Sequence, residues 1–131
     1  MINIPVSAGE LFDKLSILCI KLDKIKDDNK LKLVNKELEE LILICDVVAH
    51  KHKHSVKELE KLQSELLIVN TELWDIEDDI RECERKRLFD QTFIDLARSV
   101  YFTNDERAKV KNDINKTFGS ELVEVKSYEE Y

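Results

Sequence analysis

One stretch of the sequence decides the fold: LEKLQSELLIVNTELWDIEDDIREC, residues 59–83. Apolar residues recur along it at alternating steps of three and four, and charged or amide residues fill most of the positions between them. A mean spacing of about 3.5 residues keeps one apolar edge turned toward a partner helix, as in a coiled coil. The edge consists of Leu59, Leu62, Leu66, Val69, Leu73, Ile76, Ile80 and Cys83. We therefore expect one long helix, over residues 55–88, to organise the rest of the chain.

Start and stop signals predict the limits of all the helices. Ser55 begins a Ser-x-x-Glu capping box, in which two side chains hydrogen-bond backbone N–H groups that the helix leaves free. The same pattern begins at Ser7 and, with threonine, at Thr103. Asp90 is a suitable N-cap, and Gly119 is a typical helix stop. Helices are expected at residues 7–26, 30–50, 55–88, 90–101 and 104–118, followed by a tail at 120–131.

The connections indicate how the helices are arranged. Residues 11–25 and 31–48 repeat the rhythm of the long helix, and short connections favour antiparallel neighbours. Running back from the turn at 49–54, the second helix reaches only to about residue 75 of the long helix, so other residues must cover the overhang. The sequence therefore predicts an all-α single domain over residues 1–131. We expect an antiparallel three-helix coiled-coil-like bundle with a long central helix and two shorter C-terminal helices packed on its overhanging end.

Composition restricts the class of protein and of partner. Two glycines, one proline and 37% charged residues in 131 residues favour long helices over sheet. A net charge of −7 disfavours nucleic acid or an anionic membrane as the main partner. The N-terminal residues lack the basic segment and apolar run of a secretory signal, and no run of about 18 apolar residues occurs. We expect a cytoplasmic protein that binds neither nucleic acid nor membrane.

Neither the cysteines nor the histidines predict a metal site. Cys19, Cys45 and Cys83 lie on or beside apolar stripes, so we interpret them as small buried hydrophobic residues. The three histidines within residues 50–54 alternate with lysines, whose ammonium groups would repel a divalent cation. This segment is therefore expected to be a solvated turn. No metal, cofactor or catalytic residue is predicted.

Trp74 marks the side of the long helix that faces away from its apolar edge. A tryptophan is seldom left in water there, so we expect the C-terminal helices or another subunit to cover it. Asp78 and Arg81 should then be partly covered as well, and Glu77 and Asp78 can both pair with Arg81 along the helix.

A complementary stripe of polar residues lies in the C-terminal helices. It consists of Asn104, Arg107, Lys111 and Asn115, which follow one another at steps of three and four, and Asn104 falls in the first turn of the expected last helix. Because a helix N-terminus has free N–H donors, this end could hold a phosphate or carboxylate, with Arg98 and Tyr101 lining the same cleft. The alternative is that these charges form interhelical ion pairs that fix the docking of the helices. The candidate ligand-binding residues are Trp74, Glu77, Asp78, Arg81, Arg98, Tyr101, Asn104, Arg107 and Lys111.

Two carboxylate pairs raise the possibility of an enzyme. All-α nucleotide pyrophosphohydrolases of the MazG type hold Mg²⁺ with an ExxE pair on one helix and an ExxD pair on the next. Glu37 with Glu40 and Glu72 with Asp75 have this pattern. In the heptads, however, Glu40 and Asp75 point away from the apolar edge, and Glu37 and Glu72 only flank it. A Mg²⁺-dependent pyrophosphohydrolase is therefore an alternative and not the first interpretation.

Several motifs resemble a family of small all-helical bacterial and phage proteins without an assigned activity. They are IPVSAGELFDKL (4–15), ELWDIEDDIR (72–81), FIDLARSVY (93–101), TNDERA (103–108) and SELVEVKSY (120–128). Members of that family tend to occur near, or fused to, glycosyltransferases of lipopolysaccharide and surface-glycan synthesis. The resemblance implies an accessory protein that scaffolds an enzyme or binds an anionic sugar nucleotide. It also implies that Glu124, Lys126 and Tyr128 dock the tail.

The first functional interpretation is a non-catalytic helical interaction or scaffold protein, accessory to surface-glycan synthesis, with a glycosyltransferase as a candidate partner. A homodimer is expected, because apolar residues outside the main edge, such as Phe12, Leu67 and Ile68, leave faces to bury. The alternatives are a binder of a sugar nucleotide or other anion at the C-terminal helices, and the Mg²⁺-dependent hydrolase.

Overall fold

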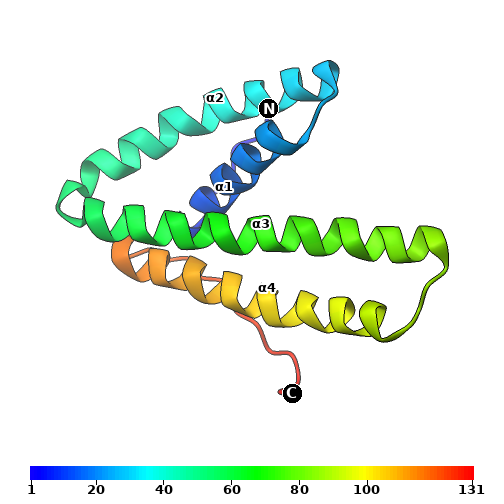
Figure 1. The fold of residues 1–131 in the computed structure, drawn as a ribbon. Helices are drawn as coiled ribbons and strands as arrows, with labels where there is room; N and C mark the ends of the chain where they lie inside the picture. The colour runs from blue at the N-terminus through cyan, green and yellow to red at the C-terminus, as the bar shows by residue number, and fades with distance from the viewer.

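The computed structural model describes residues 1–131 and contains four α-helices joined by short connections (Figure 1). The all-α prediction is confirmed. No helix combines the length and the apolar character needed to cross a bilayer. The helices are α1 (Ala8–Lys24), α2 (Asp28–Lys51), α3 (Val56–Lys86) and α4 (Gln91–Phe118), with a 3₁₀ turn at Lys53–Ser55 before α3.

Three of the predicted helix ends have the expected capping contacts. The Ser7 hydroxyl accepts a hydrogen bond from the backbone N–H of Glu10 at 3.2 Å, and Asp90 caps α4 through the N–H of Phe93 at 3.3 Å. Gly119 ends α4 with a left-handed φ of 61°. The capping box predicted at Ser55 is wrong, since this side chain makes no capping hydrogen bond. Its φ of −108° and ψ of 14° follow from the 3₁₀ turn and are not the extended conformation that an N-cap requires.

The predicted pair of C-terminal helices, 90–101 and 104–118, is a single helix in the structure. α4 continues without a break through Thr103, which is buried in its middle. A capping pattern acts only where the chain enters a helix, and neither glycine nor proline interrupts residues 91–118. Asn104 therefore lies in the middle of α4 and not in a first turn.

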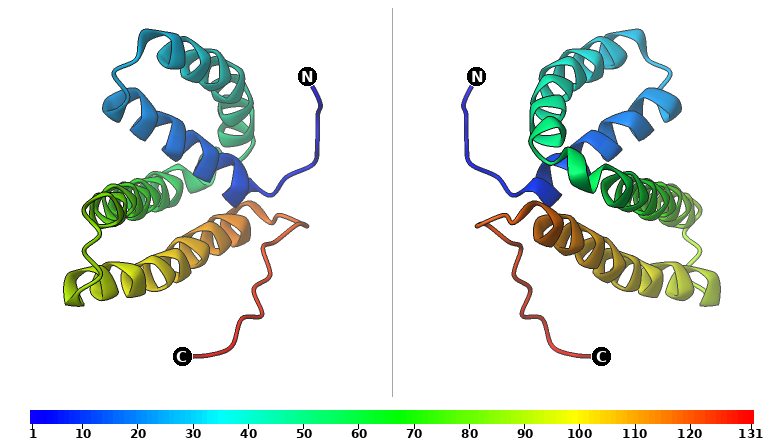
Figure 2. Two further views of the ribbon diagram at one scale, coloured as in Figure 1. Left: turned by 90° about the vertical axis from the view of Figure 1, so that its right-hand side faces the viewer. Right: turned by 90° about the vertical axis from the view of Figure 1, so that its left-hand side faces the viewer.

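α3 and α4 form an antiparallel hairpin, and α1 and α2 form a V-shaped pair on one side of it (Figure 1). α3 and α4 lie antiparallel along their lengths, and α1 runs from this hairpin to the start of α2 (Figures 1 and 2). α2 then packs on α1 and diverges from α3, with which it has little contact. The expected bundle, in which α2 would lie along α3, is not the arrangement observed. α1 and α4 cover the apolar edge of α3 instead.

The apolar core lies where α1 crosses the hairpin. Leu66 of α3 and Ile114 of α4 are fully buried there, and the Phe12 ring stacks on Phe118 with 5.6 Å between centroids. Phe12 is thus covered within one chain and leaves no face for a partner, contrary to the prediction, whereas Leu67 and Ile68 are exposed as expected. The core cluster contains Leu11, Phe12, Cys45, Leu59, Leu62, Leu66, Val110, Ile114 and Phe118.

The three cysteines differ in burial. Cys45 is buried in the core as predicted, while Cys83 is half-buried. Cys19 is exposed, so its predicted burial is wrong: it lies between the buried residues Leu18 and Ile20, but on the outer side of α1. All three are free thiols.

Candidate functional site

The predicted ligand-binding residues divide into two groups that lie at different places on the α3–α4 hairpin. Trp74 is half-buried, whereas the other residues of the first group are exposed: Glu77, Asp78 and Arg81 on α3, and Arg98 and Tyr101 on α4. The second group, Asn104, Arg107 and Lys111, begins in the middle of α4 and continues toward its C-terminal end, where α1 crosses the hairpin (Figure 1). Asn104 and Arg107 are half-buried and Lys111 is buried.

The first group does not form a covered site. Arg81 pairs with Glu77 at 3.3 Å along α3, as helical spacing predicted, but both side chains are largely in solvent. Within one chain the C-terminal helix does not cover Asp78 and Arg81, since both are exposed and no third helix closes this part of the α3–α4 hairpin (Figure 1). The anion site predicted at a helix N-terminus is also wrong, since Asn104 lies in mid-helix and its turn has no free N–H groups.

The second group is part of a network of polar residues that joins α1, α3, α4 and the C-terminal tail. We call it the junction cluster. It consists of Glu10, Asp13, Ser16, Asn70, Arg107, Lys111 and Glu124.

Asp13 is the centre of the junction cluster. Only 1% of its surface is exposed, and it receives a two-pronged interaction from Arg107, with Nε 3.0 Å from Oδ1 and the terminal nitrogen on Oδ2. Asn70 donates to the same Oδ1 at 2.9 Å and to the Ser16 hydroxyl at 3.2 Å. The hydrogen bond to Asp13 raises the pKa of Arg107. A paired guanidinium and carboxylate therefore hold α1 and α4 together, with α3 completing the hydrogen bonds.

Lys111 forms the second half of the junction cluster. Its Nζ lies 2.8 Å from Glu10, 3.0 Å from Glu124 and 4.0 Å from Asp13. The contact with Glu124 has the distance of an ion pair without the alignment of a hydrogen bond. Burial lowers the pKa of Lys111, but the carboxylates of Glu10 and Glu124 outweigh burial, so the pKa is raised. Since Arg107 and Lys111 already face three carboxylates, the cluster has no spare positive charge for an anionic ligand.

Beside the junction cluster, backbone N–H groups of α1 donate hydrogen bonds to side chains of α4 and of the segment that follows it. The N–H of Gly9 donates to Asn115 Oδ1 at 2.6 Å, and the N–H of Ala8 donates to the Ser120 hydroxyl at 3.0 Å. A Cβ at Gly9 would lie 2.3 Å from the carbonyl oxygen of Lys111, so only glycine allows this approach. The first N–H groups of α1 thus have partners within the chain and are not available to bind an anion.

Sequence reasoning missed Gly9, Asp13, Ser16 and Asn70. A signal for the first three was present, because Gly9, Asp13 and Ser16 recur at steps of four and three and form a small, polar stripe beside the apolar face of α1. Such a stripe is typical of a helix that another helix approaches closely. The signal for Asn70 was weaker, since a single amide beside an apolar edge is common on exposed helices.

The tail returns along α4. Besides the Glu124 ion pair, Lys126 Nζ lies 3.5 Å from the carbonyl oxygen of Asn104, and the Tyr131 hydroxyl bonds to Asp105. The Tyr131 ring lies against Tyr101, with 5.4 Å between centroids. Glu124 and Lys126 therefore dock the tail, as the family resemblance implied, whereas Tyr128 is exposed. A pocket of about 590 Å³ is lined by Tyr101, Asp105, Lys126, Tyr128, Glu129, Glu130 and Tyr131.

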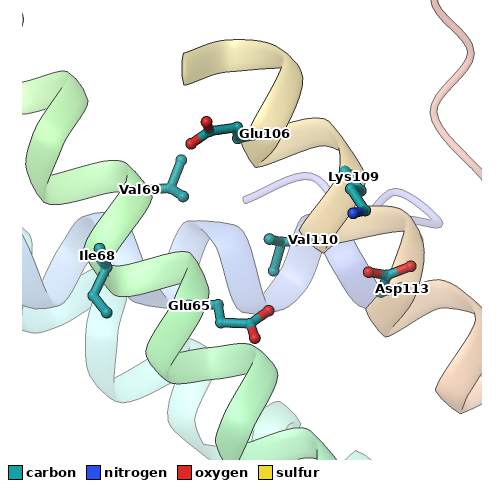
Figure 3. Close-up of a pocket in the computed structure, with 7 residues that line it drawn as sticks. All are labelled: Glu65, Ile68, Val69, Glu106, Lys109, Val110 and Asp113. Carbon is teal, nitrogen blue, oxygen red and sulfur yellow. The ribbon is translucent and has the colours of Figure 1, made fainter. Parts of the chain in front are cut away.

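A second pocket, of about 290 Å³, lies between α3 and α4 (Figure 3). Its lining consists of Glu65, Ile68, Val69, Glu106, Lys109, Val110 and Asp113. Three carboxylates and one lysine surround an apolar floor, so the pocket is acidic and disfavours a phosphate or sugar nucleotide. None of the ligand-binding residues predicted from the sequence lines it.

The carboxylate pairs proposed for Mg²⁺ do not come together. Glu37 pairs with Lys14 at 3.0 Å and Asp75 with Lys24 at 3.6 Å, while Glu40 and Glu72 are exposed on helices that diverge. No group of three or more histidine, cysteine or carboxylate side chains lies close enough together to hold a metal ion. The geometry therefore does not favour the pyrophosphohydrolase alternative.

The fold and the junction cluster define an all-α protein whose buried charges lock three helices and a C-terminal segment to one another. The model of a family of unknown function, DUF6165, matches residues 2–131, and the chain belongs to this family. Comparison with curated proteins and with solved structures finds no match.

Proposed function

We propose that this protein is a non-catalytic helical interaction protein that assembles with other chains through apolar helix faces. The observation that carries the proposal is the amount of surface. One chain exposes 9519 Å², whereas a globular monomer of 15.4 kDa exposes about 7,200 Å² by the usual scaling with mass. The extended ends contribute part of this excess, but large apolar side chains are also exposed along the helices. They include Leu33, Leu43, Ile44, Val47, Leu67, Ile68, Ile94 and Phe102.

The junction cluster supports the same proposal. Its two cations are paired with carboxylates of the same chain, so the cluster fixes the helices to one another and does not offer a site for an external anion. In an interaction protein with few buried residues, such buried ion pairs keep the exposed helix faces at fixed positions. The sugar-nucleotide alternative lacks a free cationic site at Arg107 and Lys111, the residues on which it depended.

Two partners are part of the proposal. The first is a second copy of the chain, because the surplus apolar surface belongs to every copy. The second is a glycosyltransferase of lipopolysaccharide or surface-glycan synthesis, which the family resemblance suggests. A cytoplasmic location is the corresponding expectation from the sequence.

Analytical sedimentation measures the mass of the particle in solution and so tests self-assembly. We expect a mass larger than that of one 15.4 kDa chain, over a wide range of protein concentrations. The mass should be the same at low and high salt, because salt screens charges but does not weaken apolar contacts. A single chain at every concentration would reject self-assembly.

A thermal-shift screen tests the alternatives. Nucleoside di- and triphosphates and nucleotide sugars, with and without Mg²⁺, should leave the unfolding midpoint unchanged, since a ligand raises it only by binding the folded state. A clear rise that Arg98→Glu abolishes would overturn the proposal in favour of an anion binder, because Arg98 is exposed and outside the junction cluster. Release of pyrophosphate from a nucleoside triphosphate with Mg²⁺ would instead favour the hydrolase.

A further inference from the structure

The C-terminal half of α2 is apolar on all sides. Its segment LILICDVVA, residues 41–49, contains only one polar residue, Asp46. Cys45 is buried in the core, and Leu41, Val48 and Ala49 pack against it. On the opposite side, however, Leu43 is 68% exposed and Val47 is 55% exposed. A helix that is apolar all round is normally covered all round, so this side of α2 lacks a partner within the chain.

The exposed side has its own helical register. Glu40, Leu43, Val47 and His50 recur at steps of three, four and three, on the side of α2 opposite Cys45, and all four are exposed. We call these four residues the α2 outer edge. α1 is the only helix that α2 contacts extensively, and α2 lies at the periphery of the molecule (Figure 1). The outer edge therefore has the residue spacing of a coiled-coil edge, with the two apolar residues Leu43 and Val47 at its centre.

We infer that the α2 outer edge pairs with the α2 outer edge of a second copy, antiparallel and across a two-fold axis. This inference rests on the proposed function and names the first partner and its surface. A two-fold contact brings the same patch of both chains together, so a self-complementary edge suffices to build it.

The order of residues selects the antiparallel direction. When Leu43 packs against Val47 of the partner subunit, the register also sets Glu40 opposite the partner's His50. Each apolar residue then meets an apolar residue, and the carboxylate meets an imidazole that can donate to it. In a parallel pair Glu40 would instead meet the partner's Glu40, and two carboxylates in one layer repel each other.

The surface of the whole chain leaves room for a dimer contact. Each chain exposes about 2,300 Å² more than expected for its mass, part of it on the extended ends, and a standard interface buries about 800 Å² of each partner. The exposed Leu67 and Ile68 on α3 are a less suitable self-association surface. Ile68 lines the acidic pocket, and a two-fold contact there would bring the carboxylates of two chains together.

Leu43→Lys tests the assignment of the surface, with Ile94→Lys as its matched control. Both positions are exposed aliphatic residues of equal size on helices, but Ile94 lies on α4, away from α2. A charge in the centre of an interface should weaken the dimer about a hundredfold, so Leu43→Lys should sediment as one chain with unchanged helix content. Ile94→Lys should remain a dimer.

The other outcomes separate this inference from the proposed function. If the wild-type protein assembles and Leu43→Lys assembles equally well, self-assembly stands and the α2 outer edge is not its surface. If the wild-type protein is a single chain at every concentration, this inference and the self-assembly part of the proposed function are both overturned, whereas assembly with a different protein is not.

A charge exchange tests the direction of pairing. Glu40→Lys should weaken the dimer, and adding His50→Glu in the same chain should restore it, because the antiparallel register sets these positions opposite each other. In a parallel pair the double variant would not recover. Failure to recover, in a protein that Leu43→Lys dissociates, would overturn the antiparallel register alone.

Discussion

The two ends of the α3–α4 hairpin are both amphipathic helix, but they differ in how deeply their residues are buried. At one end α1 crosses the hairpin, Leu66 and Ile114 are fully buried, and Asp13 is enclosed. At the other end α3 and α4 have only each other, and Phe93 and Leu96 are half-buried. Two helices can bury one edge of each other, whereas a third is needed to enclose residues on all sides. Burial of a polar residue in this protein is therefore a property of the junction and not of its own helix.

The ion pairs show the same difference. Arg81 and Glu77 are four residues apart on one helix and lie in solvent, where such a pair contributes about 0–1 kcal/mol. Arg107 and Asp13 come from different helices, and the carboxylate is enclosed. Breaking a buried pair leaves an uncompensated charge, which costs far more. Asp13 with Asp78, and Leu66 with Leu96, are matched residues that allow this difference to be measured.

The largest difference is expected for Asp13→Ala against Asp78→Ala. Removing Asp13 leaves Arg107 without its carboxylate and Asn70 without its acceptor, which should lower the free energy of unfolding by about 3–5 kcal/mol. Asp78 is exposed, so its removal should change stability by no more than about 0.5 kcal/mol. Urea unfolding at one fixed protein concentration measures both. Equal effects would mean that the junction cluster does not stabilise the fold.

Leu66→Ala against Leu96→Ala compares the apolar packing of the two ends. Leu66 is fully buried among residues of the core cluster, so its truncation should cost about 2–5 kcal/mol. Leu96 is half-buried and has less contact area to lose, so the cost should be clearly smaller. Thermal unfolding followed by circular dichroism gives the ranking. A larger loss at Leu96 would contradict the position assigned to the core.

Gly9→Ala tests the closeness of α1 and α4. The new methyl group would lie 2.3 Å from the Lys111 carbonyl oxygen, so the helices must separate, at a cost of about 1–3 kcal/mol. Gly119→Ala is the control, since nothing lies within 4 Å there and only its left-handed φ of 61° opposes the substitution. That strain should cost about 1 kcal/mol. If Gly9→Ala were neutral in urea unfolding, the close approach would be wrong.

The effect confined to one pH range is expected from alkaline pH acting on Cys45. Burial, with smaller contributions from Asp46 and Cys19, raises the pKa of Cys45 from 9.0 to about 11. The folded state then holds this proton more tightly than the unfolded chain, so the resulting stability is complete below pH 9 and is lost as pH rises toward 11. The raised pKa of Lys111 acts in the same direction at higher pH. The unfolding midpoint should therefore fall above pH 9.

Cys45→Val is the control for this pH dependence, because valine fills a similar volume and does not titrate. Its midpoint should fall less steeply between pH 9 and 11 than that of the wild-type protein. Identical slopes would exclude Cys45 as a cause of the loss of stability at alkaline pH and attribute that loss to Lys111.

Local signals in the sequence were sufficient for the helices themselves. Ser7 and Asp90 begin helices and Gly119 ends one, as predicted. On α3 the residues Leu59, Leu62 and Leu66 are buried on the predicted apolar edge. These features depend on residues within a few positions of each other, where hydrogen bonding and periodicity act directly. The candidate site was predicted only in part. Arg107 and Lys111 were found because they stand out as cations on a helix, but Asp13, the buried carboxylate that pairs with Arg107, was not.

The sequence by itself determined which segments are helical, where most of them end and which face of each is apolar. The tertiary structure decided which helix covers which face: α1 and not α2 completes the apolar edge of α3, α4 is one helix through Thr103, and Asp13 meets Arg107. An apolar face has a direction along its own helix but no preference for one partner among several apolar faces. That choice depends on close contacts between residues far apart in the chain, such as Gly9 with Lys111, which no local pattern encodes.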